Sequence, residues 1–202
     1  MELFDEQEPI IPDLPDAHIL YYPRFIAEPE QQLLFDKLYK DTLWRQDDIT
    51  VFGTTYPQPR LTALYGEEGK PYSYSGITMT PAPFTPLLKE LKQRIEDVFD
   101  ASYSTVLLNL YRHGQDSNGW HSDDEKELGK NPVIASLSLG AVRRFHLKHK
   151  KDKTLKYSLD LDPGSLLIMA GTTQHYWKHQ LAKTQKQVEP RINLTFRMVL
   201  PL

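Results

Sequence analysis

The chain of 202 residues contains no cysteine. This absence excludes disulfide bonds, thiolate metal sites and a cysteine nucleophile, and it is compatible with a reducing compartment. Apolar runs long enough to cross a bilayer are also missing, and the N-terminus has no segment typical of a secretory signal. With a mean hydropathy of −0.52 and 25% charged residues, we expect an intracellular protein that is neither secreted nor bound to a membrane.

An excess of positive charge is missing as well, since the net charge is −3 and the pI is about 6.2. Nucleic-acid-binding proteins are normally basic, so the charge of the whole chain argues against that class. The charge is uneven, however, because residues 1–30 are acidic and one later stretch is crowded with cations. Its members are Arg143, Arg144, Lys148, Lys150, Lys151, Lys153 and Lys156. This stretch is either a local phosphate-binding patch or the solvated tip of a hairpin.

Hydrophobic periodicity predicts two helices followed by a series of strands. Residues 28–41 have a proline near their start, and residues 86–99 follow Thr85, a residue type typical of helix N-caps. Strand patterns begin after Ser102 and are separated by turn residues. They cover 105–111, 133–139, 143–149, 154–161, 165–170 and 191–200. We interpret the chain as an α+β fold in which N-terminal helices support an antiparallel barrel or jelly roll.

The expected domain organisation is simple. Residues 1–17 are acidic and contain three prolines, so we expect a flexible N-terminal arm. Residues 18–202 are long enough for one well-filled domain, with the β-rich core at about 103–202.

Three residues have the chemistry of a metal site. His121 and Asp123 are two positions apart, so on a strand their side chains point to the same face. A distant histidine can complete the set, and spacing alone does not decide between His175 and His179. Two imidazoles and one carboxylate suit non-haem Fe(II), because they fill one face of an octahedron and leave the other open for a co-substrate and O₂. Taken alone, His121 is as easily an ordinary polar loop residue.

Two arginines near the C-terminus indicate which co-substrate to expect. Arg191 and Arg197 lie six residues apart, with Asn193 and Thr195 between them. Guanidinium groups hold a small dicarboxylate by charge-assisted, bidentate hydrogen bonds. The metal triad and the paired arginines together favour an oxygenase that uses Fe(II), 2-oxoglutarate and O₂.

With these residues in place, the chain from about His18 to its end resembles the AlkB family of nucleic-acid dealkylases. The motifs that carry the resemblance are NLYRHGQDSNGWHSDDE, IASLSLGAVRRFHLKHK, PGSLLIM, HYWKHQL and PRINLTFR, with QPRLTALYG and YSYSG upstream. The run VFG before QPR is similar to the branch of the family that prefers double-stranded DNA. The resemblance implies a double-stranded β-helix and a nucleotide-recognition lid at about residues 45–80. Such a protein is expected in the cytoplasm of a bacterium or the nucleus of a eukaryote.

The resemblance also implies roles for individual residues. The iron ligands would be His121, Asp123 and His179, because the family places its second histidine ligand within WKHQL. Arg191 would pair with the carboxylate of 2-oxoglutarate that lies far from the iron. The other residues implied for the co-substrate pocket are Tyr111 and Thr195 at that far end, Asn109 and Arg197 at the end that chelates iron, and Asn193 between them.

For the nucleic acid, the resemblance implies that the target base leaves its stack and enters the site. Phe52 in VFG resembles the finger residue that fills the vacated stack, although a core aromatic on a strand is an equally good interpretation. Tyr74 would stack on the flipped base opposite the ring of His121. Arg60 would steady the finger or the flipped nucleotide, or else form a structural salt bridge. The residues expected near the base edge or around the metal are Tyr72, Asp124 and Glu125.

These observations leave three functional hypotheses. The leading one is a monomeric DNA repair dioxygenase that demethylates 1-methyladenine and 3-methylcytosine and releases aldehyde, succinate and CO₂. The basic stretch that begins at Arg143 would then contact DNA. The second hypothesis is the same chemistry on RNA or on single-stranded DNA. The third is a catalytically silent nucleic-acid-binding module, which would predict a broken triad, whereas every expected ligand is present here.

Overall fold

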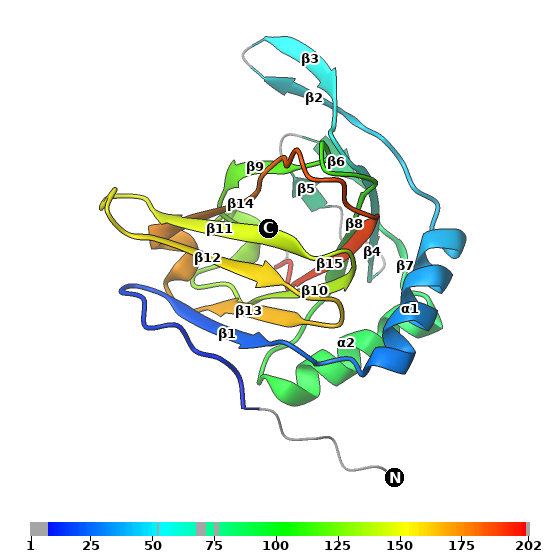
Figure 1. The fold of residues 1–202 in the computed structure, drawn as a ribbon, viewed down its shortest axis with the longest axis horizontal. Helices are drawn as coiled ribbons and strands as arrows, with labels where there is room; N and C mark the ends of the chain where they lie inside the picture. The colour runs from blue at the N-terminus through cyan, green and yellow to red at the C-terminus, as the bar shows by residue number, and fades with distance from the viewer. Residues whose placement is uncertain (1–7, 52, 68–71, 75–76, 201–202) are drawn as a thin grey trace.

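Two facing, largely antiparallel sheets form the body of the protein in the computed structural model, which describes residues 8–51, 53–67, 72–74 and 77–200 (Figure 1). The main sheet has the strand order β1 (His18–Tyr22), β13 (Leu166–Ala170), β10 (Ile134–Gly140), β15 (Arg191–Arg197), β8 (Thr105–Tyr111), β4 (Leu61–Gly66) and β7 (Ala82–Pro83). The minor sheet has the order β12 (Lys156–Leu161), β11 (Arg143–His149), β14 (Trp177–Leu181) and β9 (Asn118–His121). Two further hairpins pair β2 (Asp48–Val51) with β3 (Thr54–Pro57), and β5 (Tyr72–Tyr74) with β6 (Ile77–Met79). The architecture is the expected α+β jelly roll.

Two helices cover the outer face of the main sheet (Figure 1). The helix α1 (Glu28–Asp41) has the predicted bounds, and α2 (Pro86–Val98) ends one residue earlier than predicted. The Thr85 hydroxyl accepts a hydrogen bond from the Leu88 N–H at 3.2 Å, as expected for an N-cap. The described residues also form two short helical segments, the helix α3 (Thr173–Tyr176) and the 3₁₀ turn η1 (Lys126–Leu128). Among the described residues, no helix is long and apolar enough to span a membrane.

The strand β15 shows how the two layers are divided. Its alternate residues Ile192, Leu194 and Phe196 are fully buried against the helices, in one cluster with residues of α1 and α2. The intervening polar residues therefore point between the two sheets, since successive side chains on a strand face opposite ways. The residues that face inward in this way are Arg191, Asn193, Thr195 and Arg197. All four are buried, so the space between the sheets holds a polar site beside a smaller apolar cluster.

The N-terminal segment differs from the flexible arm that was expected. Within the described part, Ile10 exchanges two backbone hydrogen bonds with Tyr21, at 2.8 and 2.9 Å. The indole N–H of Trp177 donates to the Pro15 carbonyl at 2.9 Å, and Leu14 packs against the apolar cluster between the sheets. The arm was expected to be loose because it is acidic and rich in proline. Its isolated apolar residues nevertheless find partners on strands that are distant in sequence.

Strands from the N-terminal half complete the main sheet. The strand β4 pairs with β8, and β1 forms the edge beside β13. Neither was among the strands predicted, all of which followed Ser102. The short strand β14 was also missing from the prediction, although it carries the histidine of WKHQL. A local pattern of five residues that includes lysine and glutamine contains too little alternation to identify a strand.

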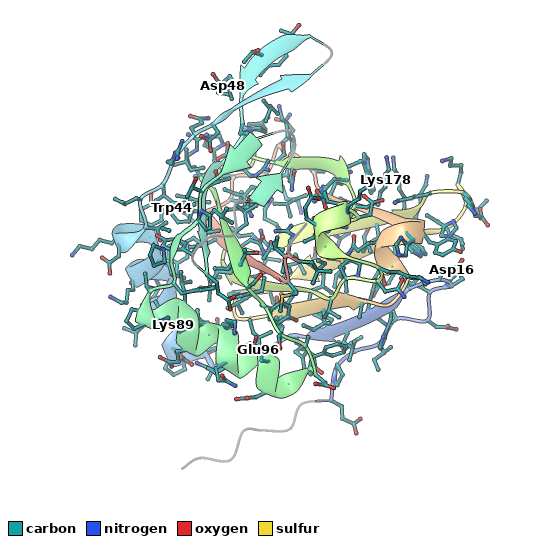
Figure 2. The ribbon with its side chains drawn as sticks, turned by 180° about the vertical axis from the view of Figure 1, so that it is seen from behind. Asp16, Trp44, Asp48, Lys89, Glu96 and Lys178 are labelled. Atoms are coloured by element: carbon teal, nitrogen blue, oxygen red, sulfur yellow. The ribbon has the colours of Figure 1, made fainter. Side chains whose placement is uncertain are left out.

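The hairpin formed by β2 and β3 projects from the body, beyond the edge of the barrel (Figure 1). Asp48, at its base, marks its position in the view from behind (Figure 2). All four side chains of β3 are exposed, so the ribbon packs on little else in the described part of the chain. Gly53 has a φ of +79°, and glycine tolerates this left-handed conformation at the turn without steric cost.

Candidate metal centre and co-substrate pocket

The three predicted iron ligands come together between the sheets. One potential ligand atom from each of His121, Asp123 and His179 lies within 4.8 Å of the others. The two histidines are direct cross-strand partners on β9 and β14, with ring centroids 4.2 Å apart. The rival His175 lies on α3 instead, where its exposed ring contacts the Asn131 side chain at 3.0 Å. The structure therefore groups His179, and not His175, with the other two residues.

Both histidines of the cluster are held as neutral imidazoles. Burial lowers the pKa of His179 to about 3, and the adjacent His121 acts in the same direction because two protonated rings would repel each other. Burial also lowers the pKa of His121, although the Asp123 carboxylate opposes that effect. The His121 Nδ1 lies 2.7 Å from the Gly119 carbonyl oxygen, to which it must donate because a carbonyl only accepts. This bond leaves the lone pair of the neutral His121 ring on Nε2. The ring of Phe145 stacks on that of His179, with the centroids 5.3 Å apart.

The carboxylate of Asp123 is buried and ionised. Burial alone would raise its pKa, but the nearby Arg197 guanidinium, and the two histidines whenever they are protonated, act against that effect and lower it. The Arg197 guanidinium donates to Asp123 Oδ1 at 2.9 Å. The backbone N–H of Asp123 in turn donates to the side-chain oxygen of Gln174 at 2.9 Å. With Arg197 on its carboxylate and Gln174 on its backbone N–H, Asp123 is a preorganised ligand for a divalent metal ion.

Arg191 is a buried cation without a counter-ion among the described residues. Its side chain donates to the Ser138 hydroxyl at 2.8 Å and stacks against the Tyr111 ring, 5.4 Å from the centroid. Its Nε is buried and has no hydrogen-bond partner in the described part of the structure. Burial lowers the pKa of Arg191 to about 10, so the guanidinium is still charged at neutral pH. An unpaired buried charge is costly, and the cost indicates that an anionic ligand completes this site.

A cluster of hydrogen-bonded polar side chains lies in the same hollow as Arg191 and the metal triad. Asn109 and Asn193 are cross-strand partners on β8 and β15, and their side chains contact each other at 3.4 Å. Thr195 donates to Asn193 at 2.8 Å, and Asn193 donates to the Ser136 hydroxyl at 2.8 Å. Together with Arg191 and the triad, these residues line one hollow between the sheets.

The residues present fit Fe(II) and 2-oxoglutarate. Two neutral imidazoles and one carboxylate within 4.8 Å of one another form the donor set that non-haem Fe(II) prefers. The unpartnered Arg191 Nε lies in the same hollow, as a dicarboxylate bound to the iron requires for its far end. His121, Asp123 and His179 would hold the metal, and Arg191 would hold the remote carboxylate.

Arg60 supports this pocket. It is almost fully buried, and its Nε donates to Asn109 Oδ1 at 2.8 Å. A second nitrogen lies 3.3 Å from the Ser117 carbonyl oxygen. The expected roles were a structural salt bridge or the steadying of the finger or the flipped nucleotide. Within the described residues Arg60 has no carboxylate partner and its contacts position Asn109, while a contact with the finger or the nucleotide stays a prediction.

The basic stretch does not act as one patch. Arg143 was expected at the surface, yet it is buried and donates to the carbonyls of Asp116 and Ala182 at 3.0 and 2.7 Å. Arg143 shares a face of β11 with apolar residues, and this explains its burial. Arg144 is exposed but forms two hydrogen bonds of 2.8 Å with Asp160. Neither arginine therefore presents an unpaired guanidinium for a phosphate.

Other residues expected near the substrate differ in the partners that they have. Lys150 pairs with Asp124 at 2.7 Å and donates to the Gln174 carbonyl at 2.8 Å. Lys151 lies over the Tyr176 ring at 5.4 Å. Burial, followed by the charge of Asp123, raises the pKa of Glu125, and its buried Oε2 has no hydrogen-bond partner among the described residues.

Some predictions fall where the structure says nothing. Phe52 lies outside the described residues, between β2 and Gly53. The backbone of Tyr72 and Tyr74 forms β5, but their side chains are not described. Their proposed contacts with a base therefore remain predictions.

Several pocket residues were not anticipated from the sequence. Ser136, Ser138 and Gln174 are buried and hydrogen-bonded to Asn193, Arg191 and Asp123. The alternation of SLSL offered a signal for the serines, because polar residues recur at every second position of a buried strand. For Gln174, on a helix of four residues, no local pattern gave one.

Comparison with known proteins agrees with this geometry. The family model of the 2OG-Fe(II) oxygenase superfamily matches residues 18–197. The human alpha-ketoglutarate-dependent dioxygenase alkB homolog 3 is 44% identical over 194 residues, which cover 92% of this chain and 67% of that protein. The DNA oxidative demethylase ALKBH2 of Bos taurus is 37% identical over 190 residues, covering 89% of this chain and 68% of that protein.

Solved structures support the fold. OsALKBH1 superposes with a TM-score of 0.65 at 17% identity, covering 89% of this chain and 97% of its own. A prolyl hydroxylase from Trichoplax adhaerens superposes with a TM-score of 0.60 at 10% identity. The superposition covers 90% of this chain and 83% of the hydroxylase chain. These likenesses show the double-stranded β-helix alone. Together with the triad and the sequence relatives, they lead to one conclusion: the chain belongs to the AlkB family of Fe(II)- and 2-oxoglutarate-dependent dioxygenases.

Proposed function

We propose that this protein removes methyl groups from the ring nitrogens of alkylated DNA bases, with 1-methyladenine and 3-methylcytosine as substrates. The observation that carries the proposal is the joint presence, in one hollow, of the triad and of Arg191, whose buried Nε has no hydrogen-bond partner among the described residues. The name of a relative with 37% identity, a DNA oxidative demethylase, supports the substrate class.

The side chains of the hollow have separable tasks in this reaction. Iron and 2-oxoglutarate, when bound, supply with O₂ the oxidation of the N-methyl carbon, with succinate, CO₂, formaldehyde and the unmodified base as products. The neutral His121 and His179 and the ionised Asp123 provide the ligand atoms, and Arg197 keeps Asp123 charged. Arg191 orients the co-substrate by its remote carboxylate. The protein thus positions the methyl carbon and leaves the oxidation to the cofactor.

Recognition of the base would involve residues at the mouth of the hollow. A base within a duplex must be flipped out to reach the metal. Glu125 supports this step, because its buried Oε2 has no hydrogen-bond partner among the described residues and the residue lies two positions after a triad member. A carboxyl group in this position can accept a hydrogen bond from a base amine. Tyr74 is proposed to stack on the base, with Tyr72 and Asp124 beside its edge.

We further propose that Phe52 acts as a finger in duplex substrates. The projecting β2–β3 hairpin supports this role (Figure 1), because Phe52 falls in the sequence between the two paired strands β2 and β3. An apolar wedge at such a tip can replace the stacking that a flipped base leaves behind, worth a few kcal/mol. Phe52→Ala should reduce repair of duplex DNA more than repair of single strands. Equal losses on both substrates would contradict the finger role and favour single-stranded DNA or RNA as the target.

The direct test is repair of defined oligonucleotides. Purified protein is incubated with Fe(II), ascorbate, 2-oxoglutarate and a 1-methyladenine oligonucleotide, either single-stranded or annealed, and the products are weighed by mass spectrometry. Loss of the methyl mass should require 2-oxoglutarate and disappear in His121→Ala. Succinate formation without repair would mean that the enzyme has another substrate. The absence of both products would contradict the proposed function.

A further inference from the structure

The outer face of the minor sheet carries a second set of functional groups. Strands β9 and β14 direct His121 and His179 inward, so their neighbours in sequence face outward. On the outward side lie Trp120, which is 37% exposed, and Lys178. Figure 2 labels Lys178 at the periphery, on the opposite side of the molecule from Lys89 of α2. The strands that hold the metal triad therefore present a different surface to solvent.

Three lysines form a row across this face. Lys148 on β11 is the direct cross-strand partner of Lys156 on β12 and of Lys178 on β14. Like charges directly opposite on adjacent strands repel each other and destabilise a sheet. In the described part of the chain, no ion pair joins any of the three to a carboxylate. The row thus has an electrostatic cost that a bound polyanion would relieve.

Neighbouring acidic groups do not offset this charge. On the same face, Asp160 is already engaged by Arg144 through two bonds of 2.8 Å. Asp124 pairs with Lys150 at 2.7 Å. In the turn between β11 and β12, Asp152 accepts hydrogen bonds from the backbone and hydroxyl of Thr154. The acidic side chains close to the row are therefore occupied, and its charge is directed to solvent.

An aromatic side chain adjoins the lysine row. The Lys148 Nζ lies 4.1 Å from the centroid of the Trp120 ring, a cation–π distance. Both residues line a groove on the outer face, which we call the minor-sheet groove. Its lining residues are Trp120, His146, Leu147, Lys148, His149, Lys153, Lys156, Tyr157 and Ser158. A partly exposed indole beside several cations combines the two elements with which proteins hold unpaired nucleic-acid strands.

We propose that the minor-sheet groove binds the single strand that continues from the target nucleotide, with phosphates on the lysine row and a base stacked on Trp120. Trp120 and the triad member His121 lie on opposite faces of β9, which is an edge strand of the minor sheet, so a nucleic-acid strand with one base in the metal site can reach the indole by passing around that edge. Stacking requires an unpaired base, and the groove therefore favours single-stranded sequence on that side of the lesion. The inference rests on the proposed function, since it assumes a nucleic-acid substrate.

The test measures binding of a fluorescein-labelled, unmodified oligothymidylate by fluorescence anisotropy over a series of salt concentrations. The row variant carries Lys148→Ala, Lys156→Ala and Lys178→Ala, and it should bind roughly tenfold or more weakly at low salt. Its slope of log K against log salt should be shallower by about 2, since each phosphate contact on a single strand contributes about 0.7. Trp120→Ala should weaken binding by roughly fivefold or more with little change of slope.

A charge-matched control separates the groove from general electrostatics. Lys40→Ala, Lys89→Ala and Lys130→Ala remove the same charge from exposed positions outside the groove. A row variant that binds like this control, or like the wild type, would overturn the proposal. The double variant Lys156→Ala and Lys178→Ala, which keeps the Lys148–Trp120 contact, should melt no lower than the wild type because repulsion along the row has been removed. A lower melting temperature of this double variant would contradict the argument from like charges.

Repair assays distinguish failure of this inference from failure of the proposed function. The advantage of a long 1-methyladenine oligonucleotide over a lesion-bearing trinucleotide, in kcat/KM, should shrink in the row variant and in Trp120→Ala. If the wild type binds the probe through the groove but repairs nothing, the groove stands and the proposed function fails. If repair proceeds and the advantage is unchanged in both variants, the groove is wrong. Binding of an acidic peptide in place of the oligothymidylate would likewise overturn the assignment.

Discussion

Arg191 offers the sharpest test of the co-substrate site, because its buried charge lowers the folding stability of the ligand-free protein. Its guanidinium is buried, donates to one hydroxyl, and has an unpartnered Nε among the described residues. Burial lowers its pKa to about 10. The difference from an ordinary guanidinium corresponds to a penalty on the order of 3 kcal/mol. The penalty is fully present below the folded pKa, hence at neutral pH, and is relieved only as the pH rises above about 10.

Replacing Arg191 with methionine should therefore separate ligand binding from stability. Two charge-assisted hydrogen bonds to a carboxylate contribute at least about 3 kcal/mol, so the KM for 2-oxoglutarate should rise roughly 100-fold. The free energy of unfolding of the ligand-free protein should stay within about 1 kcal/mol of wild type or increase, since a buried charge is removed. Succinate formation at varied 2-oxoglutarate measures the first effect, and urea denaturation measures the second.

The control for this experiment is Arg94→Met. Arg94 lies on α2, where it pairs with Glu30 at 2.6 Å, so its loss should leave the KM unchanged. The reasoning is refuted if Arg191→Met keeps the KM of the wild type. It is also refuted if the variant without ligand loses about 3 kcal/mol of stability, because the guanidinium would then be a satisfied structural group.

Three other changes test the rest of the site. Asp123→Ala should abolish iron binding. Because it also removes one side of the buried ion pair between Asp123 and Arg197, it should cost about 3–5 kcal/mol in urea denaturation of the chelator-treated protein. The lowered pKa of His179, about 3, means that only the unfolded chain takes up this proton. Stability of the iron-free protein should therefore fall by about 1.4 kcal/mol per pH unit as pH drops from the ordinary imidazole value towards 3, and His179→Leu should remove this slope in urea titrations. Gln174→Leu should weaken iron affinity in a competition assay with a chelator while thermal melting still shows a folded protein; unchanged affinity would deny Gln174 a positioning role.

The prediction that Arg143 lies in a surface patch used the charge of the run RRFHLKH and neglected its alternation. The run RRFHLKH alternates, so Arg143 shares a face with Phe145 and Leu147, and the structure buries all three. The crowding of cations nevertheless suggested a surface patch. Period-two alternation predicted the burial of Arg143 better than the clustering of cations did. On a strand, burial depends on the face to which a side chain points, even when the residue is charged. Arg143 meets its hydrogen-bonding needs with backbone carbonyls from other loops, which no local pattern predicts.

Other parts of the site depended on contacts between distant segments. The triad could be chosen from the sequence because its residue types and order are chemically specific. The choice between His175 and His179 needed the resemblance, since α3 and β14 are too short to show a period. The role of Arg60 also emerged only in three dimensions, where a residue of the predicted lid donates to Asn109 of β8. Secondary-structure propensity and hydrophobic alternation are properties of single segments. They do not predict which distant segments pair across the sheet.

The division of labour along β15 has a consequence for how this enzyme tolerates mutation. Odd-numbered positions of the strand, from Arg191 to Arg197, line the reaction site, whereas the even-numbered ones anchor the helices. Substitutions at the first set should therefore disable catalysis in a chain that still folds, and those at the second should unfold a chain whose chemistry is intact. A deep mutational scan that reports abundance and activity separately would show two interleaved patterns of period two. Selection for new substrates and selection for robustness can thus act on adjacent residues with little interference.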